Sequence, residues 1–164
     1  MLYTFTGAPD GVFPSDLVLD ATGNVFGTTT AGGAGTCASG PGCGTVFKLN
    51  TRTGRETILY RFAGGTDGAF PIAVIRDMTG NLYGTTGTGG NPMCTDTYYP
   101  GCGTVFELDT AGQEIVLHRF SKTDGARPSV GLLRNAAGII YGVTTYGGSS
   151  SCNYGCGTVF EIKP

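Results

Sequence analysis

The chain of 164 residues contains no tryptophan and one histidine, and only 13% of its residues are charged. Its net charge is −2, so it offers no basic surface to nucleic acid or to an anionic membrane. It has no run of 18 apolar residues, and the sequence therefore predicts no membrane-spanning segment. With a single histidine, His118, a serine–histidine or cysteine–histidine catalytic pair has only one candidate base.

What the sequence does contain is one unit repeated three times. The phrase GTVF, followed by a charged and an aliphatic residue, occurs at 44–49, 103–108 and 157–162. Phrases of the type GNLYGTT precede it, and a DG-x-x-P phrase opens each unit. The prolines of that opening phrase, Pro14, Pro71 and Pro128, are 57 residues apart. Recurrence of several phrases in one order identifies a tandem repeat.

Each unit holds four short runs of β-branched and aromatic residues, separated by Gly, Asn, Asp and Pro, and no run has helical periodicity. We therefore predict an all-β protein of three tandem four-stranded antiparallel meander units. The predicted units are residues 12–62, 69–120 and 126–162, and residues 2–6 are the last strand of a preceding unit. Asp20 and Asp77 each open a tight turn between the first two strands, and Asn135 replaces them in the third unit.

Four-stranded units in tandem are typical of β-propeller blades, although a monomeric β-trefoil or β-prism also has threefold internal symmetry. The order of strands favours the propeller-like fold, because the chain begins with a fourth strand and ends after a third. We predict that the first strand completes the last sheet, by pairing with a second chain. The strands in this predicted contact contain Leu2, Tyr3 and Phe5 on one side and Val159 and Phe160 on the other. Such a head-to-tail contact either closes into a ring or extends into a filament.

Two cysteines per unit flank the loop that precedes the GTVF phrase. We predict disulfides within the units, pairing Cys37 with Cys43, Cys94 with Cys102 and Cys152 with Cys156. A metal site is not expected, because no C-x-x-C motif is present and the spacing changes between units. Disulfides form in oxidising compartments, so the expected location is extracellular or at the cell surface.

The GTVFKL phrase, LYGTT followed by a glycine pair, and LYxF followed by DG and Pro together resemble the GloVer-containing, or choice-of-anchor, tandem-repeat extracellular proteins. The resemblance covers essentially the whole chain. It implies a bacterial exported or surface protein built from these repeats, in a family whose members are attached to the cell by different sorting tails. It implies no established activity and no catalytic residues.

His118 occupies the strand position held by Tyr3 and Tyr60 in the other units, which is typical of a strand-face substitution. The strand carboxylates are interpreted as a solvated face rather than as a paired acid and base; they are Glu56, Glu107, Glu114 and Glu161. We therefore expect no enzymatic activity and no cofactor.

Two sets of residues are candidates for a binding face. Asp10, Asp67 and Asp124 recur before a glycine, where they serve turn formation or form a repeated binding loop. In a meander these connections share one end of the sheet with the disulfide loops, which differ most between units. The tyrosines of those loops are Tyr98, Tyr99 and Tyr154, and they suit contact with a sugar or a partner protein.

The predicted function is that of a non-enzymatic extracellular or cell-surface repeat protein that assembles with itself by strand complementation. The alternative is a lectin-like propeller that binds a carbohydrate or another ligand on its variable loop face.

Overall fold

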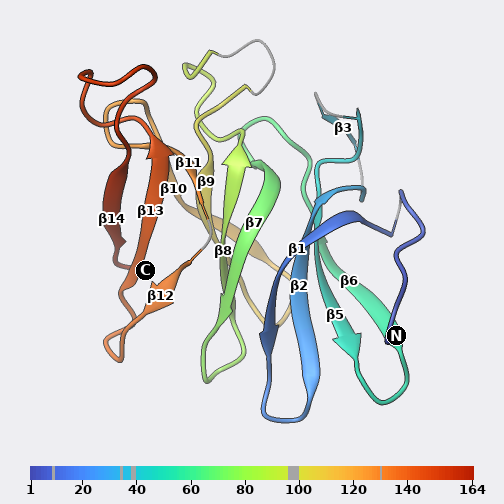
Figure 1. Ribbon diagram of the computed structural model, residues 1–164. Coiled ribbons are helices and arrows are strands. Elements are labelled where there is room, and N and C mark those ends of the chain that lie inside the picture. Colours follow the sequence, from blue (N-terminus) through green and yellow to red (C-terminus); the bar gives the residue numbers. More distant parts are fainter. Residues whose placement is uncertain (9, 34, 38–39, 96–99, 130) are drawn as a thin grey trace.

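In the computed structural model, the described residues form three antiparallel sheets that stand side by side in a row, with a short hairpin at the first disulfide loop (Figure 1). The structure describes residues 1–164 except residues 9, 34, 38–39, 96–99 and 130. Sheet one contains β1 (Val12–Leu19), β2 (Asn24–Ala31), β5 (Thr45–Asn50) and β6 (Arg55–Arg61). Sheet two contains β7 (Ala69–Arg76), β8 (Leu82–Thr88), β9 (Thr104–Leu108) and β10 (Glu114–Arg119). Sheet three contains β11 (Ala126–Pro128), β12 (Leu133–Arg134), β13 (Ile140–Tyr146) and β14 (Thr158–Ile162).

The remaining strands, β3 (Thr36–Cys37) and β4 (Gly40–Pro41), form the small hairpin. In sheets one and two the strands follow one another in chain order, as a meander requires. In sheet three, β11 and β12 both pair with β13 and together take the place of a single first strand, and β14 also pairs with β13. The all-β meander architecture predicted from the repeats is therefore confirmed.

The turns between the first two strands depend on one side chain each. The Asp20 carboxylate accepts backbone hydrogen bonds from Thr22 and Asn24, each at 2.8 Å. These bonds, with one from the Asn24 amide group as the largest contribution, lower the pKa of Asp20 because they favour the charged carboxylate. In sheet three the Asn135 amide oxygen accepts the equivalent bond from the backbone of Ile139 at 3.0 Å.

The apolar core lies between the sheets rather than inside any one of them. The cluster between sheets one and two includes Phe26, Val46, Val74, Leu82 and Phe106. The cluster between sheets two and three includes Ala73, Val105, Leu132, Ile140 and Phe160. Strand β7 of sheet two also contacts sheet one through a hydrogen bond. The backbone amide of Val74 donates it to the Asp16 carboxylate at 3.0 Å. Each sheet is therefore stabilised by its neighbours, as in other repeat proteins.

The phenylalanine of the GTVF phrase anchors each of these interfaces. Its ring packs edge-on against the phenylalanine that directly follows the last strand of the preceding sheet or, in sheet one, against Phe5 of the N-terminal segment. The pairs are Phe5 with Phe47, Phe62 with Phe106 and Phe120 with Phe160, at centroid distances of 5.1, 5.2 and 5.0 Å. The repeat of these phrases thus reflects a repeated aromatic contact between neighbouring units.

A glycine of the second strand makes room for each ring. A Cβ atom at Gly27, Gly84 or Gly142 would lie 2.6, 2.3 or 2.3 Å from the ring of the adjacent strand. No real side chain tolerates that separation, so the glycine of the GTT phrase is required by close packing rather than by a turn.

The ends of the chain differ from the other units. Residues 2–6, predicted to be a strand, form no strand in the structure and pair with none of the sheets. They pack on sheet one through Phe5 instead. At the other end, β14 pairs with β13 and, among the described residues, with no second strand. The two ends lie on opposite sides of the row (Figure 1).

Candidate functional site

Three disulfides close the loops that precede β5, β9 and β14. The structure joins Cys37 to Cys43, Cys94 to Cys102 and Cys152 to Cys156, with Cα–Cα distances of 5.3, 5.6 and 5.2 Å. These are the local pairs predicted from the sequence. Their short loops have a small closure entropy, so the disulfides fix the loops more than they stabilise the whole fold.

The recurring aspartates Asp10 and Asp67 form hydrogen bonds within the connections that lead from one unit to the next. Asp10 accepts a hydrogen bond from the Tyr3 hydroxyl at 2.8 Å, and Asp67 accepts one from Tyr60 at 2.8 Å. The same carboxylates accept backbone bonds from the start of the connection, at 2.7 Å from Thr6 in the first unit. Burial and the bond to Asp10 raise the pKa of Tyr3 to about 12, so its hydroxyl remains a donor at physiological pH.

His118 takes the place of the tyrosine in the third connection. Its Nε2 lies 3.0 Å from the Asp124 carboxylate, which also accepts a bond from the Ser121 amide at 2.7 Å. The histidine and the three aspartates thus hold chain connections together, and the structure directs their carboxylates toward the chain itself. This geometry accords with the turn interpretation of the aspartates.

Two carboxylates on the outer strands depart from the solvated face expected of them. Glu56 and Glu114 are only partly exposed, and Oε1 of each is buried with no hydrogen-bond partner among the described residues. Burial, and second to it the nearby charge of Asp10 or Asp67, raises the pKa of each to about 7. Sequence reasoning missed them because their partners are more than 40 residues away in the chain.

We expect the E56Q/E114Q double variant to be more stable than the unmodified chain at pH 8. A carboxyl group whose pKa is higher in the folded than in the unfolded chain stabilises the fold only while it is protonated. The contribution of Glu56 and Glu114 is therefore lost as the pH rises from their ordinary pKa of 4.5 to their folded pKa of about 7. After allowance for solvent screening, the gain at pH 8 is about 1 kcal/mol. Urea unfolding at pH 5 and pH 8 measures it. The variant E161Q, changed at an exposed glutamate, serves as control. If the free energy of unfolding changed equally between pH 5 and pH 8 in both variants, the prediction would be contradicted.

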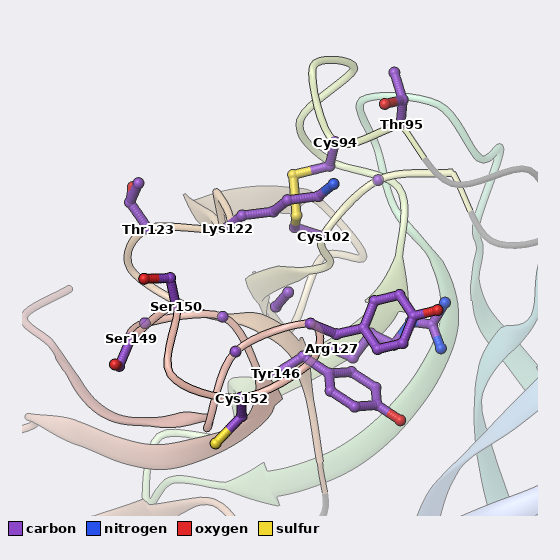
Figure 2. A pocket seen from close by; sticks show the side chains of 16 residues that line it. Cys94, Thr95, Cys102, Lys122, Thr123, Arg127, Tyr146, Ser149, Ser150 and Cys152 are labelled. Atoms are coloured by element: carbon purple, nitrogen blue, oxygen red, sulfur yellow. A yellow bond between two sulfur atoms is a disulfide. The ribbon is translucent and has the colours of Figure 1, made fainter.

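A cavity of about 740 Å³ lies on the loop face, between the disulfide loops of sheets two and three (Figure 2). The Cys94–Cys102 disulfide, Lys122, Arg127, Tyr146 and Tyr154 are among the residues that line it. The Cζ atom of Arg127 lies 5.5 Å from the centroid of the Tyr146 ring, and the centroids of the Tyr146 and Tyr154 rings are 6.0 Å apart. The loop face predicted from the sequence to be a binding face therefore contains a cavity between these two disulfide loops.

The backbone around this cavity is held in place by the preceding unit. The Arg127 amide donates to the Cys102 carbonyl at 2.8 Å, and the Gly148 amide donates to the Lys122 carbonyl at 2.9 Å. Of the tyrosines named from the sequence, Tyr154 lines the cavity with 82% of its surface exposed, while Tyr98 and Tyr99 lie outside the described residues.

Sequence reasoning missed Lys122, Arg127 and Tyr146. The available signal was their difference from the matching positions of the other two units, where Phe13 and Phe70 stand in place of Arg127.

The end faces of the row expose residues that are buried at matching positions inside it. Val159 of sheet three is 80% exposed, whereas Val46 and Val105 are both 0% exposed. Leu17 of sheet one is 61% exposed, whereas the matching Val74 is 2% exposed. Each end face therefore exposes an apolar side chain at a position that is buried where two sheets meet.

The repeats identify the chain's relatives. The family model described as the Gloeobacter/Verrucomicrobia repeat matches residues 1–152. The chain belongs to this family. The resemblance noted from the GTVF and GTT phrases is thus confirmed for this repeat protein, while no curated protein sequence matches it.

Two solved structures resemble the repeat protein in fold. One, described as a gluconolactonase, has a TM-score of 0.53 and 16% identity, covering 91% of this chain and 49% of its own. The other, virginiamycin B lyase from Staphylococcus aureus, has a TM-score of 0.53 and 13% identity, covering 92% of this chain and 41% of its own. Both are β-propellers, so the propeller-like fold is confirmed, and at this identity the likeness concerns the fold alone. The repeat protein spans about half the length of these structures.

Within the described part of the repeat protein, there is no helix with the length and apolar character needed to cross a membrane.

Proposed function

We propose that this repeat protein is a non-enzymatic extracellular interaction module whose copies join head-to-tail by strand complementation. The observation that carries the proposal is the exposure of Val159 on β14, at a position that is buried in both preceding units. A second copy placed against this end face would bury it in the same way.

The free edge of β14 suits a strand from the N-terminus of a second copy. In sheets one and two the third strand pairs with the fourth so that Val46 faces Tyr60 and Val105 faces His118. The matching register pairs Val159 with Tyr3 of a second copy. Backbone pairing at an open edge is a common mode of association, and it removes an edge otherwise open to aggregation.

The N-terminal segment is already placed for this role. Phe5 packs on Phe47 in the way that Phe62 packs on Phe106, and Tyr3 bonds Asp10 as Tyr60 bonds Asp67. A strand bound in that position would bring its own sheet against the exposed Leu17 of sheet one. Strand pairing and face packing therefore support the same arrangement of copies.

The span of about half a solved propeller supports a closed ring of two copies over an open filament. The three disulfides support an extracellular location. A non-enzymatic role is supported by the use of His118 and the recurring aspartates in chain connections.

A second candidate function is ligand binding on the loop face, because the cavity of about 740 Å³ lies there. That volume is within the usual range for small-molecule sites.

The mass of the chain in solution tests the assembly. We expect light scattering to give a multiple of 16.8 kDa for the unmodified chain. The V159R variant should be monomeric, because the arginine would be buried without a partner at the contact. M78R introduces the same charge on a side chain that is fully exposed away from the end faces, and it should assemble normally.

A variant lacking residues 1–6 should also be monomeric, since it loses the donated strand. An unmodified chain that stays monomeric at high concentration, or a V159R variant that assembles like M78R, would refute the proposal.

A further inference from the structure

We infer that the Cys152–Cys156 disulfide is a redox-sensitive part of the contact between copies. Gly7, Phe13 and Pro14 of a second copy cover its loop in the assembly, whereas a dithiol reductant opens the loop in the free chain. The inference rests on the proposed head-to-tail assembly and deepens it. It adds a loop contact to the strand contact, and it names a chemical condition that controls association.

The first argument is that the third disulfide is more exposed than the other two. In the first two disulfides, Cys43, Cys94 and Cys102 are 0%, 5% and 2% exposed. In the third, Cys152 and Cys156 are both exposed. A thiolate must reach a sulfur atom before it can exchange with a disulfide, so access decides which disulfide reacts. A reductant therefore reaches the third disulfide first.

The first two disulfides are covered by the connection that leads to the next sheet. A Cβ atom at Gly64 would lie 2.9 and 3.1 Å from the Sγ atoms of Cys37 and Cys43, so this glycine lies directly against the disulfide. In the next unit, Sγ of Cys94 lies 3.8 Å from the carbonyl oxygen of Phe120, where the following connection begins. The third disulfide is exposed because no described residue covers it in this way.

A backbone hydrogen bond fixes each cover to its loop. The Phe70 amide donates to the Cys43 carbonyl at 2.9 Å, and the Cys102 carbonyl accepts the matching bond from sheet three at 2.8 Å. Within the described residues, the Cys156 carbonyl forms no matching bond. The residue that matches Phe70 at the start of sheet one is Phe13, which is 71% exposed. One acceptor and one matching residue thus remain, at opposite ends of the row.

The glycine after the second cysteine leaves room for the proline of the next unit. A Cβ atom at Gly44 would lie 2.3 Å from Cδ of Pro71. A Cβ atom at Gly103 would lie 2.6 Å from the matching proline of sheet three. Gly157 and Pro14 are the third glycine and the third proline of this kind. The repeat therefore seats Pro14 of a second copy against Gly157.

Gly7 of the second copy completes the cover. It matches Gly64, since each is the second residue after the phenylalanine of its connection. A Cβ atom at Gly7 would meet nothing within 4 Å, so the space beside it is open in the single chain. With the Phe13 amide on the Cys156 carbonyl, Gly7 lies against the third disulfide as Gly64 lies against the first.

Reduction by a dithiol opens the uncovered loop in two exchanges. One thiolate of the reductant attacks a sulfur, the S–S bond breaks and a mixed disulfide forms. The second thiolate then displaces the protein sulfur, and the reductant leaves as a cyclic disulfide. Two electrons and two protons pass from the dithiol to Cys152 and Cys156.

The opened loop docks poorly because nothing closes it around Gly157. Its order must then be restored when a second copy binds, which weakens association. Conversely, a docked copy covers the sulfur atoms and slows their reduction. The two effects are linked, since any contact that is favoured by the closed loop must in turn favour the closed loop.

Removal of the disulfide tests its role in association. We expect C152A/C156A to raise the dissociation constant of the assembly at least about tenfold, measured by sedimentation over a series of concentrations. C37A/C43A removes the disulfide of a contact already closed within the chain, so it should assemble like the unmodified protein. Circular dichroism checks that both variants fold.

The outcomes of this test separate the inference from the assembly proposal. Equal dissociation constants for C152A/C156A and the unmodified chain would overturn the inference and leave assembly by strand pairing in place. Equal weakening in C152A/C156A and C37A/C43A would also overturn it. An unmodified chain that stays monomeric would refute the assembly and this inference together.

Reduction of the unmodified chain tests the cover without any cysteine variant. At a fixed dithiothreitol concentration, iodoacetamide labelling followed by peptide mass spectrometry should find Cys152 and Cys156 labelled first. The labelling rate should fall at least about tenfold as the protein concentration is raised into the assembled range. M78R should show the same protection, and V159R should be labelled at one rate at all concentrations. A rate independent of concentration in the assembling chain, or earlier labelling of Cys94 and Cys102, would overturn the inference.

Discussion

The F106A variant is expected to lose about 3–5 kcal/mol of unfolding free energy, the usual cost of emptying a large aromatic site. Phe106 is 0% exposed and lies in the cluster between sheets one and two, with its ring 5.2 Å from that of Phe62. Single domains are stable by only about 5–15 kcal/mol, so the loss is a large fraction of the total.

Urea unfolding followed by circular dichroism measures this effect. F13A makes the same chemical change at a side chain that is 71% exposed, and it should cost less than about 0.5 kcal/mol. If F106A and F13A unfolded at the same urea concentration, the interface between the sheets would not be the main source of stability.

Replacing Gly84 by alanine should be nearly as damaging, although it adds only one methyl group. The new Cβ would lie 2.3 Å from the Phe106 ring and 2.6 Å from the Ala73 carbonyl oxygen. Neither the ring nor the backbone can move away without disturbing the interface, so we expect a loss of about 1–3 kcal/mol or more.

Gly87 in the same strand provides the matched control. A Cβ there would approach only the end of the Ile72 side chain closely, at 3.0 Å, and that side chain can rotate away. G87A should therefore be close to neutral, or slightly stabilising because alanine restricts the unfolded chain. The G84A/F106L double variant should be less destabilised than the sum of its parts. Equal stability of G84A and G87A would disprove the packing role of the glycine.

Much of the fold could be predicted from the sequence because its determinants are local. Asp20 and Asn135 form their turns with residues at most four positions away, and the cysteines pair across loops of similar length. Strand order followed from the three copies of each phrase. These features need no knowledge of how distant segments pack.

The features that could not be predicted depend on neighbouring units. The strand expected at residues 2–6 needs a partner strand that this chain does not place beside it. The raised pKa of Glu56 depends on burial and on the charge of Asp10, which precedes it by 46 residues. The cavity with Arg127 and Tyr146 forms only where two loops from different sheets meet, and a positive residue in one connection does not by itself indicate a pocket.

Placing the core between the sheets has a consequence for how stability scales with size. Three sheets in an open row share two interfaces, so the two outer sheets are each half covered. In a closed circle every sheet has two neighbours, and the number of interfaces equals the number of sheets. Closure thus adds stabilising contacts without adding a residue. A short repeat protein that closes into a ring with its own copies has as many interfaces between sheets as one longer chain with the same number of sheets.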